Sequence, residues 1–549
     1  MNLDNSETYQ VTEPGSRARL LLPALLCLLF VAQCVWFIGT QSLTNDEPEH
    51  ISAGLEAWRY GEFKAWDAHP PLGRLWIAAP LLFTDWAYSE YRSGVQPARP
   101  GPEEWAWRTR PMNVVLGLFL AAMLWSTARR LFSEGAANFA LALFAFSPSL
   151  IAHFSLSTTD GAGTLLIFAS AAQLLRWRRN PSRAQTVLLG AALGGSLVAK
   201  FYAAPLVAMA VVIVLLHAQE KIAWRPWEWN WAKAFAVAGV VLLTVWAAYF
   251  FHVSRVSFRD GEVTATFPGR TPSLTEKVPV QANFTFFLPA CEFFTGLGNQ
   301  VHHNWIRGHN NYFLGEVSHF RGWKLYFPVA VLLKWPTMVL LLALAALSLT
   351  LRRRIRWPRE FLLVLLFPAL FLIFSIGSNI NIGDRYVLPV YVFVLLGLAA
   401  VWMAARSRAA KIALLAALAL NSADGLRYAP DYLAHFNIFV RPAESWRLLS
   451  DSSLDWGQGL LALREYQAAH PGETLHLAYF GPVDPTLYGI RYVPLEENER
   501  ASGTVVVSAT HLSGQLLRDP LAYHWLLQYP RKTILNHSLH VFEVPATPN

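Results

Sequence analysis

Three acidic residues lie beside apolar segments of this chain, where a carboxylate could act on a substrate at a membrane surface. Asp46 and Glu47 follow the first apolar segment, and Asp160 lies between the third and the fourth. A carboxylate close to lipid is costly unless it has a partner or a function. Each of these acids could simply begin a helix. Alternatively, Asp46 could take a proton from a hydroxyl group, and Asp160 could orient the pocket or hold a cation.

Cationic side chains at the ends of other apolar segments are candidates for binding phosphate. Lys200 ends the fifth segment, where its ammonium group could also reach water along the surface. Lys334 lies inside the eighth segment, so an anionic partner is expected for it. Arg385, followed by Tyr386, could bind a phosphate through its guanidinium fork, or could form a surface pair with Asp384.

The segment 300–328 is the richest in polar side chains, and aromatic residues are interleaved with them. Its candidate substrate contacts are His302, His303, Arg307, His309 and Asn310. Either this segment is a solvated loop at the membrane interface, or it covers a cavity that binds an anionic lipid head group and a sugar. His69, which precedes two prolines, presents a similar choice between a residue of a rigid turn and a contact to phosphate or metal.

The composition indicates that these residues belong to a membrane protein with many spans. Of the 549 residues, 54% are hydrophobic and 15% are charged, against roughly 45–50% and about 25% in soluble domains. The net charge of +8 comes from clusters of Lys and Arg between apolar segments, so topology explains it better than binding of nucleic acid. About eleven segments have the length and apolarity of a membrane span. They lie near 18–40, 111–128, 136–156, 161–175, 184–199, 202–217, 233–252, 325–350, 360–377, 386–405 and 409–422.

The basic clusters also predict the orientation of the chain. They follow alternate apolar segments, which places residues 1–17 in the cytoplasm and the loops 41–110 and 253–324 outside. Within the first loop, 72–88 is apolar but interrupted, as in an interfacial or re-entrant helix. We therefore expect a mainly α, polytopic transmembrane domain over 18–423, in the plasma (inner) membrane.

The tail, 424–549, has a different pattern from the segments before it. TLHLAYFG, GTVVVSAT and LHVFEV are typical of strands, and GQGLLALREYQAAH is typical of an amphipathic helix, with Asp455 placed to cap it. The pattern predicts a small α/β domain outside the membrane.

Acids and phosphate-binding cations on one side of a membrane suit the transfer of a group from a lipid phosphate. The phosphate leaves as a stable anion, so a carboxylate base and cations around the leaving group would suffice. A divalent cation is compatible with the acids and histidines without being required. A transporter or lipid flippase is the alternative, although the paired broken helices of two related halves are not evident. A sensor anchored by its spans is a third interpretation.

These segments resemble a known family. NDEPEHISAGLEAWRYGEF followed by HPPLGRLW is similar to the first outer loop of the C-type membrane glycosyltransferases, in the branch of protein O-mannosyltransferases and lipid A aminoarabinose transferases. Further segments that resemble bacterial members of this branch are LSTTDGAGTLLIF, LGGSLVAKFYAAPLV, YFLGEVSHFRGWKLYFPVAVLLKWP, NINIGDRYVLPVYVF and DSSLDWGQGLLALREY. The aminoarabinose transferases carry a lysine before their paired prolines, where this chain has His69.

The resemblance implies a polyprenyl-phosphate-linked sugar as donor and an acidic catalytic base in the first outer loop. Carried onto this sequence, Asp46 takes the position of the base with Glu47 beside it, Asp160 matches the second acidic site, and Lys200 and Arg385 match basic positions near the carrier phosphate. We therefore expect a glycosyltransferase that moves a sugar to a hydroxyl acceptor of the cell envelope on the outer face, with inversion at the anomeric carbon. The sequence identifies neither the sugar nor the acceptor.

Overall fold

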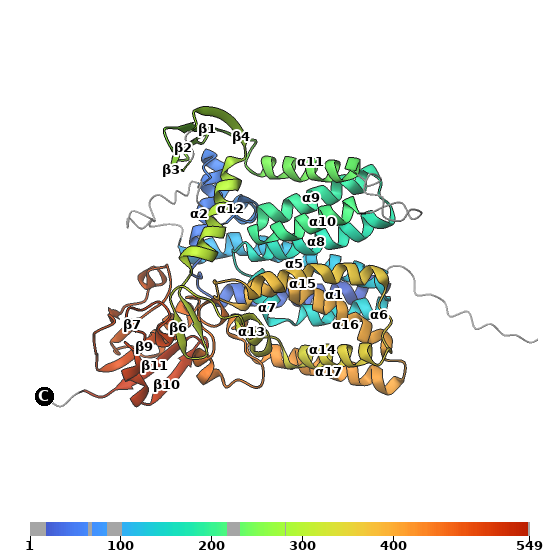
Figure 1. Cartoon of the computed structure of the whole chain (residues 1–549). Coiled ribbons are helices and arrows are strands. Elements are labelled where there is room, and N and C mark those ends of the chain that lie inside the picture. The colour runs from blue at the N-terminus through green and yellow to red at the C-terminus, as the bar shows by residue number, and fades with distance from the viewer. Residues whose placement is uncertain (1–17, 64–68, 85–100, 217–230, 280–281, 547–549) are drawn as a thin grey trace, which may run out of the picture.

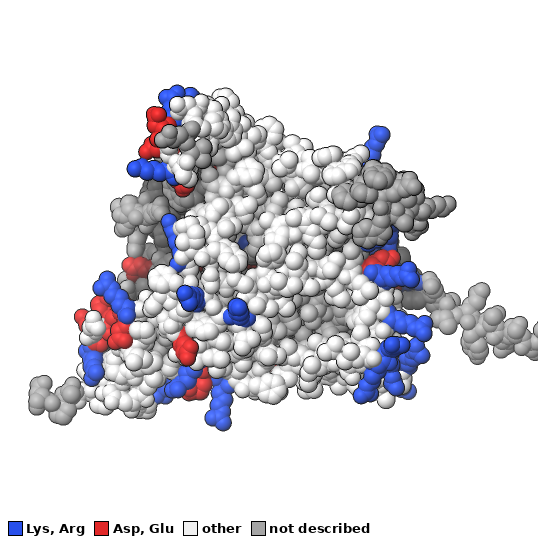
Figure 2. All heavy atoms as spheres, in the orientation of Figure 1, with Lys and Arg blue, Asp and Glu red and all other residues white. Residues whose placement is uncertain are grey.

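The computed structural model describes residues 18–63, 69–84, 101–216, 231–279 and 282–546. Long helices run alongside one another, and the strands lie at one end of this bundle (Figure 1). On the face shown in Figure 2, charged side chains gather toward the two ends of the helices and leave a broad, nearly uncharged band between them. This distribution suits a protein whose middle is surrounded by lipid.

Helices form at every apolar segment identified in the sequence. The unbroken ones are α1 (Ala18–Thr40), α5 (Pro102–Leu131), α8 (Asp160–Arg179), α9 (Arg183–Ala199), α10 (Ala204–Leu215), α11 (Trp231–Ala248), α15 (Arg359–Ile376), α16 (Leu388–Ala404) and α17 (Arg408–Leu426). Two segments are broken into bent pairs, α6 (Glu134–Ala145) with α7 (Pro148–Phe154) at 66° and α13 (Tyr326–Lys334) with α14 (Thr337–Leu351) at 113°. Pro148 and Pro336 lie at these breaks, as expected for a residue that cannot continue a helix.

Six helices of the described chain are long and apolar enough to cross a membrane, or eight if each bent pair counts as one span. The figure of about eleven spans stays a prediction, because helices such as α10 are shorter than a bilayer requires. The mostly buried helix α16 packs against α6, α8, α14 and α15, which makes it the centre of the bundle.

The segment between α1 and α5 forms α2 (Glu47–Tyr60), α3 (Pro71–Ala78) and a 3-10 turn, η1 (Ala79–Phe83). These last two elements confirm the helix expected near 72–88 as far as residue 83, while 85–88 lie outside the described residues. Helix α2 crosses α3 very closely, since a Cβ atom at Gly54 would lie 2.1 Å from the carbonyl oxygen of Arg74. This close packing fixes the direction in which α2 leaves Asp46.

The segment after α11 forms an antiparallel sheet in the order β3-β2-β1-β4. Its strands are β1 (Val253–Arg259), β2 (Glu262–Thr266), β3 (Leu274–Lys277) and β4 (Phe284–Pro289). Helix α12 (Cys291–His302), a π-helical turn η4 (His303–Arg307) and the hairpin β5 (Asn311–Phe313) and β6 (Glu316–Ser318) then lead back to the bundle.

The tail contains a sheet of five strands in the order β10-β11-β9-β7-β8. These strands are β7 (Leu475–Ala478), β8 (Val493–Pro494), β9 (Gly503–Ser508), β10 (Arg531–Leu535) and β11 (Leu539–Val544), with helices α18 (Leu460–Ala469) and α19 (Ala509–Ser513). Strand β7 runs parallel to β8 and β9, and the other pairs are antiparallel. The strands expected from the sequence are present. The predicted cap is wrong, because Gly459 precedes α18, while Asp455 accepts a hydrogen bond from the amide of Thr510 at 2.9 Å.

Short 3-10 turns connect these elements and carry several residues of the candidate site. They are η2 (Phe201–Ala203), η5 (Asp384–Val387), η6 (Tyr432–Ala434), η7 (Pro442–Arg447), η8 (Asp451–Ser453), η9 (Pro485–Tyr488) and η10 (His524–Gln528).

Candidate active site

A polar cavity of about 460 Å³ lies where the segments that follow α1 and α11, together with the tail, meet the helix ends. Its wall is built from distant parts of the sequence. It includes Asp46, His69, Lys200, Tyr202, His303, His309, Arg385, Tyr386, Asp451 and Trp456. Eight of the side chains predicted from the sequence are therefore brought to one place, seven on this wall and Asp160 against the cations that line it.

Arg385 connects the two aspartates that the sequence singled out. Its Nη1 atom lies 2.9 Å from Oδ2 of Asp46 and 3.6 Å from Oδ2 of Asp160. Oδ1 of Asp160 also pairs with Nζ of Lys200 at 2.9 Å. The side chain of Asp160 is only 3% exposed, against 25% for Asp46. Asp160 thus holds the two cations in place, while Asp46 is open to a molecule in the cavity.

Besides the two aspartates, residues of the tail hold Arg385 in position. The guanidinium carbon of Arg385 lies 4.1 Å from the ring centre of Trp456, a cation–π contact. Gly383 has a φ of 141°, and a Cβ atom there would lie 2.2 Å from Oγ of Ser452. Asp384 faces away from Arg385 and accepts hydrogen bonds from Ser149 and Ser453. The surface pair considered between Asp384 and Arg385 is not formed.

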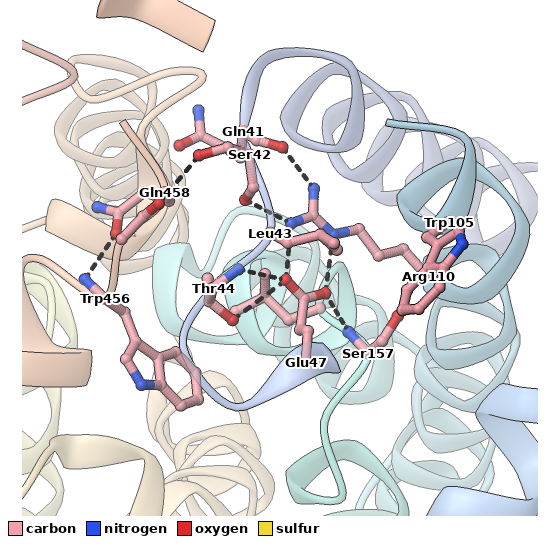
Figure 3. Close-up of polar contacts among 12 residues, drawn as sticks. Gln41, Ser42, Leu43, Thr44, Glu47, Trp105, Arg110, Ser157, Trp456 and Gln458 are labelled. Carbon is pink, nitrogen blue, oxygen red and sulfur yellow. Dashed lines mark hydrogen bonds and ion pairs between the residues drawn. The ribbon is translucent and has the colours of Figure 1, made fainter. Parts of the chain in front are cut away.

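Glu47 has a different environment from Asp46, although the two are adjacent. Its side chain is fully buried, and its oxygens accept hydrogen bonds from Arg110 at 2.8 and 2.9 Å and from the amides of Thr44 and Ser157 at 2.7 Å (Figure 3). Burial alone would raise the pKa of Glu47, but Arg110 and these hydrogen bonds outweigh it and lower the pKa. Glu47 does not line the cavity, and its contacts tie the start of α2 to α5 and to the segment before α8. No pattern in the sequence indicated that Arg110 is the partner of Glu47.

Lys334 is buried, as the sequence predicted, but outside the cavity wall. Its Nζ atom donates hydrogen bonds to the carbonyl oxygens of Leu433 at 2.9 Å and Ser453 at 2.5 Å, and lies 4.7 Å from the ring centre of Phe436. The hydrogen-bond partners of Lys334 are thus two backbone carbonyls, and Asp384 is a carboxylate whose charge acts on it. Lys334 thus attaches the tail to the helix bundle.

The candidate residues of segment 300–328 divide into two groups. His303 and His309 line the cavity with their rings stacked 5.7 Å apart. Burial, together with His303 and Arg385, lowers the pKa of His309 to about 4, so this imidazole is neutral at pH 7. His302 and Arg307 are exposed, and Asn310 pairs with His319; none of these three lines the cavity.

His69 contacts a histidine that the sequence analysis missed. The rings of His69 and His50 meet edge to face at 4.8 Å, and Nε of Arg74 donates a hydrogen bond to Nδ1 of His50 at 3.1 Å. Burial lowers the pKa of both imidazoles well below the usual range. His50 lies one helical turn after Asp46, and this spacing was the signal available in the sequence.

An apolar groove of about 240 Å³ adjoins the polar cavity, and the two share Phe201, Tyr202 and Tyr386. Its remaining wall is mainly apolar and includes Pro205, Leu297, Trp305, Phe371 and Phe374. A polar cavity next to an apolar groove fits an amphipathic molecule with one charged end.

Within the described ranges, no group of three or more His, Cys, Asp or Glu side chains is arranged to hold a metal ion. Asp46 and Asp160 instead contact Arg385 and Lys200. In this arrangement, cationic side chains supply the positive charge of the cavity.

A family model matches one part of the sequence. Residues 103–247 match the family model of dolichyl-phosphate-mannose-protein mannosyltransferases. This match covers about a quarter of the chain and identifies a glycosyltransferase segment there. It confirms the resemblance recognised in the sequence. The matched segment carries Asp160, Lys200 and Tyr202, whereas Asp46, Arg385 and Asp451 lie outside it. No curated protein matches the chain.

Several solved structures share features of this fold. The Saccharomyces cerevisiae protein O-mannosyltransferase Pmt1-Pmt2 complex bound to the sugar donor has 11% identity and a TM-score of 0.48, covering 76% of this chain and 92% of that one. ArnT from Cupriavidus metallidurans bound to undecaprenyl phosphate has 15% identity and a TM-score of 0.47, covering 97% and 100%. The same protein in the apo state has 14% identity and a TM-score of 0.49, covering 96% and 98%.

Proposed function

We propose that this membrane glycosyltransferase moves a sugar from a polyprenyl-phosphate-linked donor to a hydroxyl group of a cell-envelope acceptor. The reaction takes place in the polar cavity, on the outer face of the plasma membrane. The chain is a multi-pass protein with a cytoplasmic N-terminus and an extracytoplasmic tail. The observation that carries the proposal is the contact of Arg385 with Asp46 and Asp160, because it joins a candidate base to candidate phosphate-binding cations.

Lys200 and Arg385 form the binding site for the donor phosphate. Both are held by Asp160, and both line the cavity at its border with the apolar groove. Charge-assisted hydrogen bonds from such cations stabilise the phosphate as negative charge develops on it. The polyprenyl chain then lies in the groove. Arg307 and Lys334 were also candidates for this role, but neither lines the cavity.

Asp46 is the general base of the proposed reaction. It takes the proton of the acceptor hydroxyl as the hydroxyl oxygen attacks the anomeric carbon, on the face opposite the phosphate. The bond from the anomeric carbon to the phosphate oxygen breaks, and its electron pair leaves with the polyprenyl phosphate. The configuration at the anomeric carbon inverts. Glu47 is assigned the structural role that its contacts with Arg110 support.

The test is transfer by the purified protein and by its Asp46→Asn variant. A panel of undecaprenyl-phosphate sugars is incubated with extracted envelope acceptors, and glycosylated product is measured together with donor binding. We expect Asp46→Asn to bind donor and to lose transfer by about 100-fold or more, the scale of general base catalysis. Glu104→Gln, on the exposed surface of α5, is the matched control. Normal transfer by Asp46→Asn would refute the mechanism. Movement of unmodified donor across a proteoliposome membrane, without product, would favour a flippase.

A further inference from the structure

We infer that Asp451, in the tail, binds the acceptor hydroxyl and completes the active site that the helix bundle begins. This inference rests on the proposed function and adds to it a residue that faces the acceptor. No role was assigned to Asp451 from the sequence.

The position of Asp451 is unusual for a carboxylate. The residue lines the polar cavity, yet it is only 6% exposed. Its Oδ1 atom accepts a hydrogen bond from the amide of Ser452 at 2.5 Å, and no described residue donates to Oδ2. The backbone of Asp451 adopts a φ of 54°, which is uncommon for a residue other than glycine. Such conformations occur where surrounding contacts enforce them, often at functional sites.

The contacts that enforce this conformation come from helix α19 of the tail and from Asp455. The amide of Asp451 donates to Oγ1 of Thr510 at 3.3 Å. Thr510 is fixed in turn by Asp455, which accepts from its amide at 2.9 Å and from its hydroxyl at 2.7 Å. The loop from Asp451 to Trp456 is thereby anchored to α19, and it presents Asp451 and Trp456 to the same cavity.

The charges around the cavity favour the acceptor over the donor as the ligand of Asp451. Asp46 and Asp160 each pair with a cation, whereas Asp451 forms no ion pair within the described chain. A carboxylate without a cation would repel the donor phosphate, but it can accept a hydrogen bond from an uncharged hydroxyl group. Burial raises the pKa of Asp451 to about 7, Arg385 opposes this rise, and Asp46 adds to it. Because Oδ2 of Asp451 receives no hydrogen bond from the described chain, a hydroxyl donor is the ligand that this carboxyl group lacks.

The arrangement gives the two carboxylates separate tasks. Asp46, beside the phosphate cations, takes the proton. Asp451 orients the acceptor so that its attacking oxygen faces the anomeric carbon. No proton needs to move to Asp451, so the balance of the transfer step is unchanged.

The test compares Asp451→Asn with the unchanged protein in the full chain. Asparagine tolerates a left-handed backbone, so this variant keeps the conformation of the loop. We expect kcat/KM for the acceptor to fall by about 10- to 100-fold, the effect of losing one hydrogen bond to a charged group. The Kd for undecaprenyl-phosphate sugar should stay within about twofold of the unchanged protein. Asp451→Gly, which also removes the carboxylate but relieves the backbone strain, should show the same selective loss.

Asp519→Asn, an exposed carboxylate of the tail, is the control and should behave as the unchanged protein. Normal acceptor kinetics in Asp451→Asn would overturn the inference and leave the proposed function intact. Equal losses of donor binding and acceptor transfer in both Asp451 variants would also overturn it, because they indicate a structural role. If the unchanged protein transferred sugar from no polyprenyl-phosphate donor, the proposed function would fail and this inference with it.

Discussion

Nη1 of Arg385 lies 2.9 Å from Oδ2 of Asp46, although 339 positions separate the two residues in the sequence. The pair couples the proposed base to the proposed phosphate site. A donor phosphate that binds Arg385 competes with Asp46 for the same guanidinium group. Donor binding would thus loosen the contact of Arg385 with Asp46 and free this carboxylate to face the acceptor.

Replacement of Arg385 by lysine should impair transfer strongly. Lysine keeps the positive charge but loses the planar fork that contacts Asp46 and Asp160 together. We expect kcat/KM for the donor to fall by about tenfold or more, consistent with the loss of a charge-assisted hydrogen bond. Arg447→Lys is the matched control, because Arg447 also lies over a tryptophan, Trp446, but is exposed. If the two variants had equal kcat/KM for the donor, Arg385 would not be part of a phosphate-binding site.

Glu47→Gln should reduce stability. The change leaves the charge of Arg110 buried without its counter-charge, which typically costs about 3–5 kcal/mol. Thermal unfolding in detergent measures this loss, and Glu104→Gln, which breaks an exposed pair with Arg108, should cost less than about 1 kcal/mol. A Glu47→Gln protein with unchanged thermal stability and no transfer would return Glu47 to the catalytic role first predicted for it.

Lys334→Met should loosen the tail from the helix bundle. The ammonium group holds the carbonyl oxygens of Leu433 and Ser453, and each buried carbonyl left unpaired costs about 1–3 kcal/mol. Limited proteolysis should therefore cut between α17 and α18 faster than in the unchanged protein. Lys324→Met, at an exposed position, should leave the rate of cutting unchanged. Equal cutting of both variants would show that Lys334 does not secure the tail.

Asp451→Asn should alter how stability depends on pH. The folded protein raises the pKa of Asp451 from 3.8 to about 7, so the folded state binds this proton more tightly than the unfolded state. This stabilisation is complete at acid pH and is lost as the pH rises through about 7. The Tm of Asp451→Asn relative to the unchanged protein should therefore be higher at about pH 8 than at about pH 5. A difference in Tm that does not depend on pH would contradict the raised pKa.

Phe374→Ser should weaken binding of donors with long polyprenyl chains. Phe374 lines the apolar groove, and burying such a side chain against lipid contributes about 1.5–3 kcal/mol. We expect KM for a long-chain donor to rise by about tenfold and KM for a short-chain donor to change little. The neighbouring residue Ile373 is 65% exposed and lies outside the groove, so Ile373→Ser is the control. The same KM shift with both chain lengths would indicate that the chain does not occupy the groove.

The apolar helices and their approximate bounds follow from the sequence because they depend on local composition. The same holds for the tail strands, whose alternating residues are readable one by one. Asp46, Lys200 and Arg385 were found because charged residues at the ends of apolar segments are rare and costly. The different roles of Asp46 and Glu47 could not be found this way. They depend on Arg110, which approaches Glu47 only after α5 has packed against α1.

The contribution of the tail to the cavity could also not be predicted from the sequence. The segment DSSLDWGQGLLALREY resembles the family, but its sequence assigned no role to Asp451 or Trp456. The contact with Thr510 and the stacking on Arg385 bring these two residues to the cavity. Lys334 illustrates the same limit. Its burial followed from its apolar neighbours, but its carbonyl partners come from a segment about a hundred residues away.

The wall contributed by Asp451 and Trp456 is made late in translation. Ribosomes synthesise these residues after every helix of the bundle, so a copy that terminated before residue 451 would contain the helices without this wall. Under the proposed function, such a copy would lack a complete site for cleaving lipid-linked sugar.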